Sequence, residues 1–241
     1  MIELLHTDCM EYMRTLPDNA FDLAIVDPPY GVGSVTYMPC RRENASGGYV
    51  DTYNVVVATL DEKRQRPRFA AKSMKINHSQ NAKTTIRNLG DFNVAPPPDY
   101  FKELSRVSKN QIIWGGNYFL LPPSRCFVVW DKCQSENFSM SMCEMAWTSF
   151  NSVAKLFRLP PMGTKSDPRI HPTQKPVKLY KWLLEKFAKP GDRVLDTHLG
   201  SGSIAIACRD LDFDLVGCEI DKDYYDAAKA RLDRSTRPTQ I

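Results

Sequence analysis

The stretch from residue 193 to residue 219 reads RVLDTHLGSGSIAIACRDLDFDLVGCE. Its apolar start predicts a short buried strand, residues 203–211 predict a helix, and residues 214–219 predict a second strand that ends in an acid. Segment 196–202 joins the first strand to the helix through two glycines. A strand, a glycine turn, a helix and a strand ending in a carboxylate, here Glu219, form the nucleoside-binding half of a Rossmann-like sheet. The fold class is therefore α/β.

The same loop also permits another interpretation. Residues 200–205, GSGSIA, match the dinucleotide fingerprint, so a nucleotide-dependent oxidoreductase is an alternative. However, only about forty residues follow the loop, whereas a dinucleotide fold continues from its fingerprint into a second half. A chain with its cofactor half last accounts better for this position.

Asp27-Pro28-Pro29-Tyr30 closes the apolar run at residues 21–26, which predicts a buried strand ending in a rigid polar tip. The two prolines fix the backbone and have no N–H, so their carbonyls and the Asp27 carboxylate can accept hydrogen bonds. An acceptor cluster beside an aromatic ring can hold a planar base that carries an exocyclic amine. A strand followed by a simple Pro-Pro turn is the structural alternative.

Three motifs together resemble the DNA amino-methyltransferases, which transfer a methyl group from S-adenosyl-L-methionine to adenine N6 or cytosine N4. The tetrapeptide at residues 27–30 resembles their catalytic motif, and residues 171–176, HPTQKP, resemble the methionine-binding segment of the permuted beta-type subclass. In that subclass the catalytic motif precedes the cofactor motif. The loop at residues 196–202 resembles the subclass loop, with Thr197-His198 replacing a Pro-Phe pair. The resemblance covers residues 1–30, 100–132 and 171–234.

The resemblance implies a fold and a mechanism. The fold is a Rossmann-like, S-adenosylmethionine-dependent methyltransferase fold: a mostly parallel mixed sheet with helices on both faces, in circularly permuted order. Asp27 and the Pro28 carbonyl would accept hydrogen bonds from the amine of a flipped base, and Tyr30 would stack on that base. Methyl transfer would then be a direct in-line displacement that leaves S-adenosyl-L-homocysteine.

The resemblance also assigns cofactor contacts. Thr173 and Lys175 offer a hydroxyl and an ammonium to the cofactor's carboxylate near a helix N-terminus. Asp8 follows the first predicted strand and takes the cofactor's adenine amine, caps a helix, or does both. His198 is either a ligand contact or an ordinary loop histidine. The full expected cofactor set is Asp8, Cys9, Asp27, Thr173, Lys175, Asp196, His198, Gly200, Ser201, Gly202, Glu219 and Ile220.

A basic segment at residues 31–91 follows the catalytic motif directly. It holds ten Lys and Arg residues against five acids, although the whole chain has a net charge of only +4. Its polar sequence shows no periodicity, which is typical of functional lids and disordered segments. Its position predicts contact with double-stranded DNA rather than a merely solvated loop. The candidate contacts are Arg41, Arg42, Arg64, Arg66 and Arg68.

Length and residue counts exclude other classes. With 241 residues the chain suits one domain, residues 1–241, in which the insertion and a variable segment at residues 131–170 serve target recognition. Seven scattered cysteines and four scattered histidines argue against a disulfide framework and a metal site. Pro39-Cys40 lies inside the insertion, which argues against a cytosine C5 thiolate mechanism. With no apolar run of membrane length, we expect a cytoplasmic protein.

Several alternatives stay open from sequence alone. An aspartate in the first position of the tetrapeptide is more typical of adenine N6 enzymes, and cytosine N4 is the alternative. A catalytically idle DNA-binding module is a different class that would retain the fold. The resemblance favours a homodimer, and places the chain in restriction-modification with a cognate endonuclease or as an orphan without one.

The apolar patterns predict further elements along the chain. A helix capped by Asp99 is expected to run to Val107, and residues 131–170 are expected to be irregular apart from one strand. The remaining predictions are strands at residues 1–6, 111–114, 126–130 and 144–147 and helices at residues 10–16 and 177–188.

Overall fold

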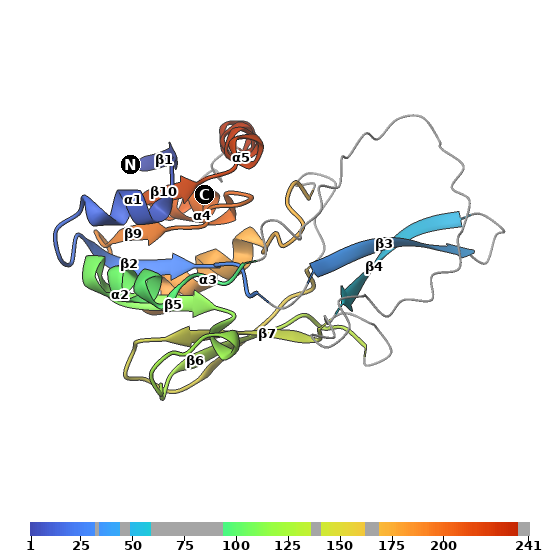
Figure 1. Ribbon diagram of the computed structural model, residues 1–241, viewed down its shortest axis with the longest axis horizontal. Helices are drawn as coiled ribbons and strands as arrows, with labels where there is room; N and C mark the ends of the chain where they lie inside the picture. The colour runs from blue at the N-terminus through green and yellow to red at the C-terminus, as the bar shows by residue number, and fades with distance from the viewer. Residues whose placement is uncertain (32–33, 44–48, 59–93, 136–140, 162–168, 236–241) are drawn as a thin grey trace, which may run out of the picture. The chain divides into compact units, whose positions relative to one another are not determined.

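A computed structural model of the chain describes residues 1–31, 34–43, 49–58, 94–135, 141–161 and 169–235, with the backbone alone for residues 34–43 and 49–58 (Figure 1). Contacts divide the chain into two units. The larger comprises Met1–Pro28 and Pro96–Ile241, and the smaller comprises Pro29–Ala95.

The larger unit is built on an eight-stranded sheet in the order β1-β10-β9-β2-β5-β7-β6-β8. The first five strands of this order are parallel: β1 (Ile2–His6), β10 (Asp214–Glu219), β9 (Arg193–Asp196), β2 (Phe21–Val26) and β5 (Ser108–Trp114). The other three form a mixed extension: β7 (Cys143–Thr148) antiparallel to β5, β6 (Phe127–Asp131) antiparallel to β7, and β8 (Lys155–Arg158) parallel to β6.

Helices cover both faces of this sheet, as predicted. Alternate residues of β2 point to opposite faces, because side chains alternate along a strand. Leu23 and Ile25 belong to one buried cluster, and Ala24 and Val26 to the other. The first cluster includes residues of α3 (Val177–Phe187), α4 (Ser203–Asp210) and α5 (Lys222–Arg234), and the second includes residues of α1 (Cys9–Arg14) and α2 (Pro98–Val107).

The chain reverses its direction of winding between β9 and β2. From β9 it passes through α4 to β10 on one side, and from β2 it passes through α2 to β5 on the other. In open α/β sheets, ligands bind outside the carboxyl ends of the strands at such a switch point. The two sequence motifs follow these two neighbouring strands, so the topology places the expected site at this edge.

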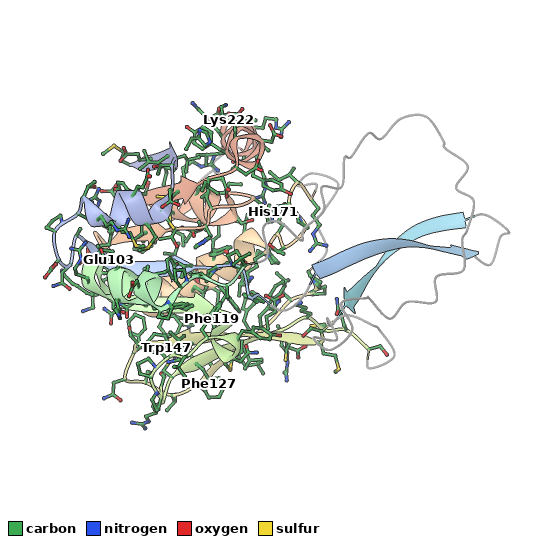
Figure 2. All side chains as sticks on the ribbon, in the orientation of Figure 1. Glu103, Phe119, Phe127, Trp147, His171 and Lys222 are labelled. Atoms are coloured by element: carbon green, nitrogen blue, oxygen red, sulfur yellow. The ribbon has the colours of Figure 1, made fainter. Side chains whose placement is uncertain are left out.

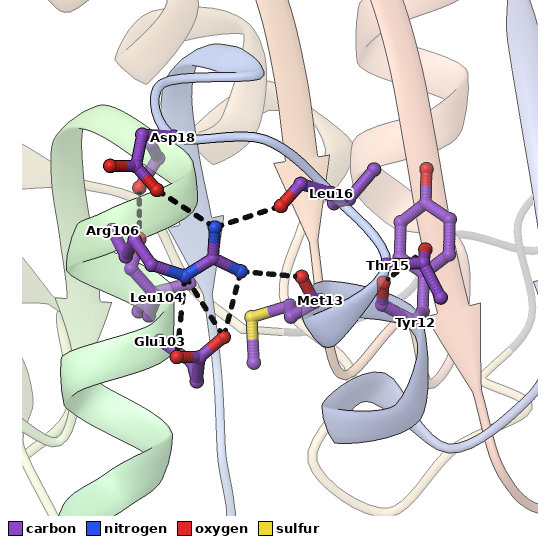
Figure 3. Close-up of polar contacts among 9 residues, drawn as sticks. Tyr12, Met13, Thr15, Leu16, Asp18, Glu103, Leu104 and Arg106 are labelled. Atoms are coloured by element: carbon purple, nitrogen blue, oxygen red, sulfur yellow. Dashed lines mark hydrogen bonds and ion pairs between the residues drawn. The ribbon is translucent and has the colours of Figure 1, made fainter.

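Arg106, the last-turn arginine of α2, ties that helix to the connection between α1 and β2 (Figure 3). Its guanidinium donates hydrogen bonds to the carbonyl oxygens of Met13 and Leu16, at 2.8 Å each. It also pairs with Glu103 at 2.8 Å and Asp18 at 3.0 Å. These carboxylates raise the pKa of Arg106 further above its usual range. One side chain thereby bonds a carbonyl in the last turn of α1 and another in the connection that leads to β2.

We expect Arg106→Met to lower the melting temperature by several degrees, because two carbonyl oxygens and two carboxylates lose a charged donor. Thermal unfolding followed by circular dichroism measures this. Lys102→Met is the matched control, since Lys102 pairs with Asp99 at the exposed surface of the same helix. Equal melting temperatures for the two variants would show that Arg106 does not hold this connection.

The smaller unit contains an antiparallel pair, β3 (Ser34–Glu43) and β4 (Tyr49–Ala58), with Ser34 opposite Ala58. The prediction that this segment lacks regular structure is therefore wrong for these residues. The available signal was composition rather than periodicity. Residues 49–58 are rich in valine and tyrosine, which favour strands.

Two smaller predictions in the larger unit are also wrong. Asp99 does not cap α2, because the helix begins at Pro98 with Pro97 as its N-cap, and the fixed backbone of proline suits the first helical position. Residues 155–158 form β8, a short strand outside the expected elements. No helix of the described ranges is long and apolar enough to cross a membrane.

Candidate functional site

Asp27 lies directly after β2, where the sheet changes winding direction, and its carboxylate meets Lys175 from the segment before α3. The Lys175 ammonium lies 2.5 Å from Asp27 Oδ2, and both side chains are largely buried. Residues 148 positions apart in the chain thus meet at the predicted edge. Pro28 is buried beside Asp27, whereas Pro29 and Tyr30 belong to the smaller unit.

Lys175 contacts a second carboxylate, which the sequence did not indicate. Its ammonium lies 3.0 Å from Glu144 Oε2 on β7. Burial alone would lower the pKa of Lys175, but Asp27 and Glu144 raise it, so the ammonium is charged. The cofactor-carboxylate contact expected for Lys175 stays a prediction. In the structure its ammonium is bound between two carboxylates of the protein.

The rest of the HPTQKP segment approaches the glycine loop through His171. The ring of His171, which is labelled in Figure 2, packs against Tyr224 of α5 with 4.4 Å between ring centroids. It lies 3.6 Å from the position that a Cβ would take at Gly200. Burial lowers the pKa of His171 to about 4, so the ring is neutral at pH 7. Thr173 is exposed, and its hydroxyl lies 3.1 Å from His171 Nδ1.

The glycine loop after β9 is held to the end of β10 by Glu219. One carboxylate oxygen of Glu219 accepts the Gly200 N–H at 2.8 Å, and the other accepts the Asp221 N–H at 2.9 Å. Burial raises the pKa of Glu219, and these backbone hydrogen bonds partly offset the rise. Gly202 has φ +69°, and a Cβ there would lie 3.1 Å from the Ala228 side chain. The loop therefore needs glycine for both its backbone and its close packing.

Arg231 of α5 forms hydrogen bonds with the same loop. This side chain is 5% exposed, and it donates to the Ser201 carbonyl at 2.7 Å and to Ser203 Oγ at 2.9 Å. The Ser201 hydroxyl lies 3.1 Å from that of Ser203. Arg231 thus fixes the backbone at the start of α4, a contact between residues 30 positions apart that no sequence pattern indicates.

We expect Arg231→Met to destabilise the fold by about 2 kcal/mol, because a buried carbonyl loses its charged donor. The variant should also bind a loop ligand more weakly. Arg209→Met is the control, because Arg209 donates to carbonyls at the end of α5, including Leu232 at 3.0 Å, and bonds none of the loop residues 200–202 among the contacts described. Urea unfolding and calorimetric titration separate the effects. Equal losses of ligand affinity in both variants would contradict the role of Arg231.

Thr197-His198, where the resembling subclass has Pro-Phe, forms a polar chain. The Tyr100 hydroxyl lies 2.6 Å from Thr197 Oγ1, which in turn lies 2.9 Å from His198 Nδ1. The His198 N–H donates to Asp196 Oδ1 at 3.0 Å. Burial lowers the pKa of His198 to about 4 and raises that of Asp196 to about 8. These hydrogen bonds hold the loop without the rigidity of a proline.

The carboxyl end of β1 completes the edge beside β10. Asp8 caps α1, because its Oδ1 accepts the N–H groups of Met10 at 2.7 Å and Glu11 at 3.0 Å. The helix-cap alternative is thereby confirmed. Burial raises the pKa of Cys9 to about 12, so its thiol is protonated. Ile220 is exposed next to Glu219.

The arginines predicted to contact DNA lie in the smaller unit or outside the described residues. Arg41 and Arg42 belong to β3, for which the backbone alone is described, and Arg64, Arg66 and Arg68 lie outside the described residues. Within the described residues no group of three His, Cys, Asp or Glu side chains could hold a metal ion.

Comparison with known proteins gives similarities across nearly the whole chain. A family of N6/N4 methyltransferases, described as DNA methylase, matches residues 60–230. The type II methyltransferase M2.DpnII of Streptococcus pneumoniae is 23% identical over 95% of this chain and 89% of its own length. M.HpaI of Haemophilus parainfluenzae is 43% identical over 63 residues, which are 26% of this chain and 20% of that protein.

Solved structures show the same fold. The structure of the M1.HpyAVI–SAM complex matches with a TM-score of 0.51 at 17% identity, covering 96% of this chain and all of that one. PvuII DNA methyltransferase, described as cytosine-N4-specific, matches with a TM-score of 0.56 at 10% identity, covering 98% of this chain and 88% of that one. The Rossmann-like methyltransferase fold is thereby established for the chain.

Proposed function

This chain belongs to the N6/N4 family of DNA methylases, and on that premise we propose that it transfers a methyl group from S-adenosyl-L-methionine to the exocyclic amine of a base in DNA. The observation that carries the proposal is the adjacency of β2 and β9. It brings Asp27 and the glycine loop to one edge of the sheet, at the switch point where α/β folds bind ligands.

The residues at this edge fit the methyl donor. Glu219 ends β10 where a ribose-binding acid is expected, and it holds the glycine loop that leads into the N-terminus of α4. The solved complex of M1.HpyAVI contains this cofactor, which supports the assignment. When bound, the cofactor supplies an electrophilic methyl group on a sulfonium. Asp8, Cys9, Asp196, His198, Ser201 and Ile220 complete the proposed cofactor surroundings.

Asp27 and Pro28 act on the base amine. An aromatic amine is a poor nucleophile because its lone pair is delocalised into the ring. Hydrogen bonds from the amine to the Asp27 carboxylate and the Pro28 carbonyl favour the tetrahedral nitrogen of the transition state, which is differential rather than uniform binding. The N–C bond forms as the C–S bond breaks, and the excess amine proton leaves to water. Tyr30 stacks on the flipped base.

We assign adenine N6 as the target because aspartate holds the first position of the tetrapeptide. Cytosine N4 methylation by the same fold is the second candidate. PvuII DNA methyltransferase, which is described as cytosine-N4-specific, shares this fold with a TM-score of 0.56 at 10% identity, so the N4 reaction is kept as an alternative. Both the fold and the family are shared by adenine N6 and cytosine N4 enzymes, so the experiment below distinguishes the two target bases.

The substrate is double-stranded DNA, contacted by residues 31–91 with Arg41, Arg42, Arg64, Arg66 and Arg68 and by residues 131–170. The excess of basic residues in the first of these segments supports this proposal, since phosphate neutralisation supplies most non-specific affinity. The type II relatives support a place in restriction-modification, with or without a partner endonuclease. We propose a homodimer as the active form.

The test incubates the protein with DNA of known sequence and labelled S-adenosyl-L-methionine, followed by single-molecule sequencing of the product. Label in DNA and modified adenines at one recurring sequence are the expected results. Modified cytosines would move the assignment to N4. Salt-dependent duplex binding without product would identify an idle DNA-binding module, and tight nicotinamide cofactor binding an oxidoreductase.

A further inference from the structure

A row of four charges of alternating sign ends at Asp27, with two buried lysines and two partly exposed carboxylates, Glu144 at 23% and Asp27 at 14%. Lys132 Nζ lies 2.6 Å from Glu144 Oε1, Glu144 Oε2 lies 3.0 Å from Lys175 Nζ, and Lys175 Nζ lies 2.5 Å from Asp27 Oδ2. The side chains of Lys132 and Lys175 are only 9% and 2% exposed. Each of the two inner groups therefore contacts two groups of opposite charge.

The two lysines also lie over a pair of tryptophan rings. Lys132 Nζ is 5.3 Å from the ring centroid of Trp130, and Lys175 Nζ is 5.1 Å from that of Trp114. These rings meet edge to face at 6.4 Å. Cation–π contact adds to the ion pairs and leaves each ammonium little freedom to move.

Such a row is costly to build, because desolvating each ion costs several kcal/mol and apolar side chains of the same volume often stabilise a fold equally well. Burial alone would raise the pKa of Glu144, but Lys175 and Lys132 lower it to about 2. Glu144 and Lys175, the two inner groups, are therefore charged, and two lysines face two carboxylates along the row. A costly row that ends at one functional carboxylate points to a role in the reaction rather than in stability.

We propose that Glu144 and Lys132 are positioning residues for methyl transfer, which hold Lys175 and, through it, fix the orientation of the Asp27 carboxylate toward the base amine. This inference rests on the proposed function. Lys175 bonds one oxygen of Asp27, so the direction of its ammonium sets the rotation of the carboxylate. Glu144 sets the direction of the ammonium, and Lys132 balances the charge of Glu144.

The order of strands in the sheet places Glu144 away from the proposed cofactor loop, so its positioning role can be tested separately from cofactor binding. Glu144 lies on β7, which is two strands from β2 on the side away from β9 and β10. The glycine loop and Glu219 follow β9 and β10. Loss of Glu144 should therefore lower kcat and leave the affinity for S-adenosyl-L-methionine unchanged.

The experiment compares Glu144→Gln, Lys132→Met and the double variant with the wild type. Glu144→Gln leaves the Lys132 charge uncompensated, so we expect kcat to fall at least about ten-fold, with the Kd of the cofactor within about two-fold of wild type. Lys132→Met should also lower kcat. The double variant should recover part of kcat, because the neutral Lys175–Asp27 pair remains. Recovery of this kind distinguishes charge balance from simple loss of packing.

The control is Lys181→Met, which breaks an ion pair with Asp210 at 2.7 Å between α3 and α4. It should lower the melting temperature without lowering kcat. Full kcat in Glu144→Gln, or a double variant worse than both single variants, overturns the inference. If Glu144→Gln does not fold, unchanged kcat in Lys132→Met overturns it and a lowered kcat supports it. A wild type that transfers no methyl group refutes the proposed function instead.

Discussion

Replacing Asp27 with alanine is expected to lower kcat for methyl transfer by about 10³-fold, because the amine loses the charged acceptor that is aimed at its developing tetrahedral form. The Kd of S-adenosyl-L-methionine should change little, since Glu219 and the glycine loop lie after other strands. Lys175 keeps Glu144 as a partner at 3.0 Å, so the variant retains a neutralising contact for its buried ammonium. Single-turnover transfer of labelled methyl to DNA measures the effect.

Asp22→Ala is the matched control for this variant. Asp22 lies at the other end of β2 and also pairs with a lysine, Lys109, at 2.7 Å. Its replacement should cost stability and leave kcat near the wild-type value. Comparable kcat in the Asp27 variant and the wild type would remove Asp27 from the mechanism.

The second large effect is expected for Glu219→Ala, which should raise the Kd of S-adenosyl-L-methionine about 100-fold, or about 2.7 kcal/mol. Two contributions add to this loss. The proposed hydrogen bonds from the ribose disappear, and the Gly200 N–H loses its carboxylate partner at 2.8 Å, so the loop is less well fixed before binding. With saturating cofactor, kcat should remain within a few-fold of the wild type. Calorimetric titration gives the Kd directly.

Asp214→Asn is the matched control, because it tests whether the loss of any acid on the same strand raises the Kd of the cofactor. Asp214 begins β10 and pairs with the N-terminal ammonium of Met1 at the surface, so its loss should leave the cofactor Kd unchanged. An unchanged Kd in Glu219→Ala would refute the ribose-binding role and leave Glu219 as a loop support only.

Those parts of the fold that depend on local pattern could be predicted from the sequence. β10 at residues 214–219 and β2 at residues 21–26 begin and end where expected, because apolar runs closed by a polar residue mark buried parallel strands. The glycine loop lies where expected, because it joins the predicted strand that ends at Asp196 to the predicted helix that begins at Ser203. α3 ends one residue before its prediction at Ala188.

The parts that depend on pairing between distant residues could not be predicted. The cofactor contact of Lys175 stays a prediction from its motif, whereas its ion pairs with Asp27 and Glu144 join segments that meet only in three dimensions. Glu144 is an ordinary polar position of a strand when the sequence is considered alone. Arg231 has an ordinary place on a polar helix, and only the tertiary fold shows that it is buried.

The interleaving of β1, β10, β9 and β2 has a consequence for how the protein is made. On the ribosome, β2 emerges more than 160 residues before its neighbour β9, and β1 emerges more than 200 residues before β10. Contacts between such distant segments form slowly, because a long loop must close before they are gained. The nascent chain thus carries Asp27 and Pro28, the residues proposed to bind the base, long before it carries the loop proposed to bind the methyl donor. We therefore expect no methyl transfer by the nascent chain before β9 and β10 have emerged.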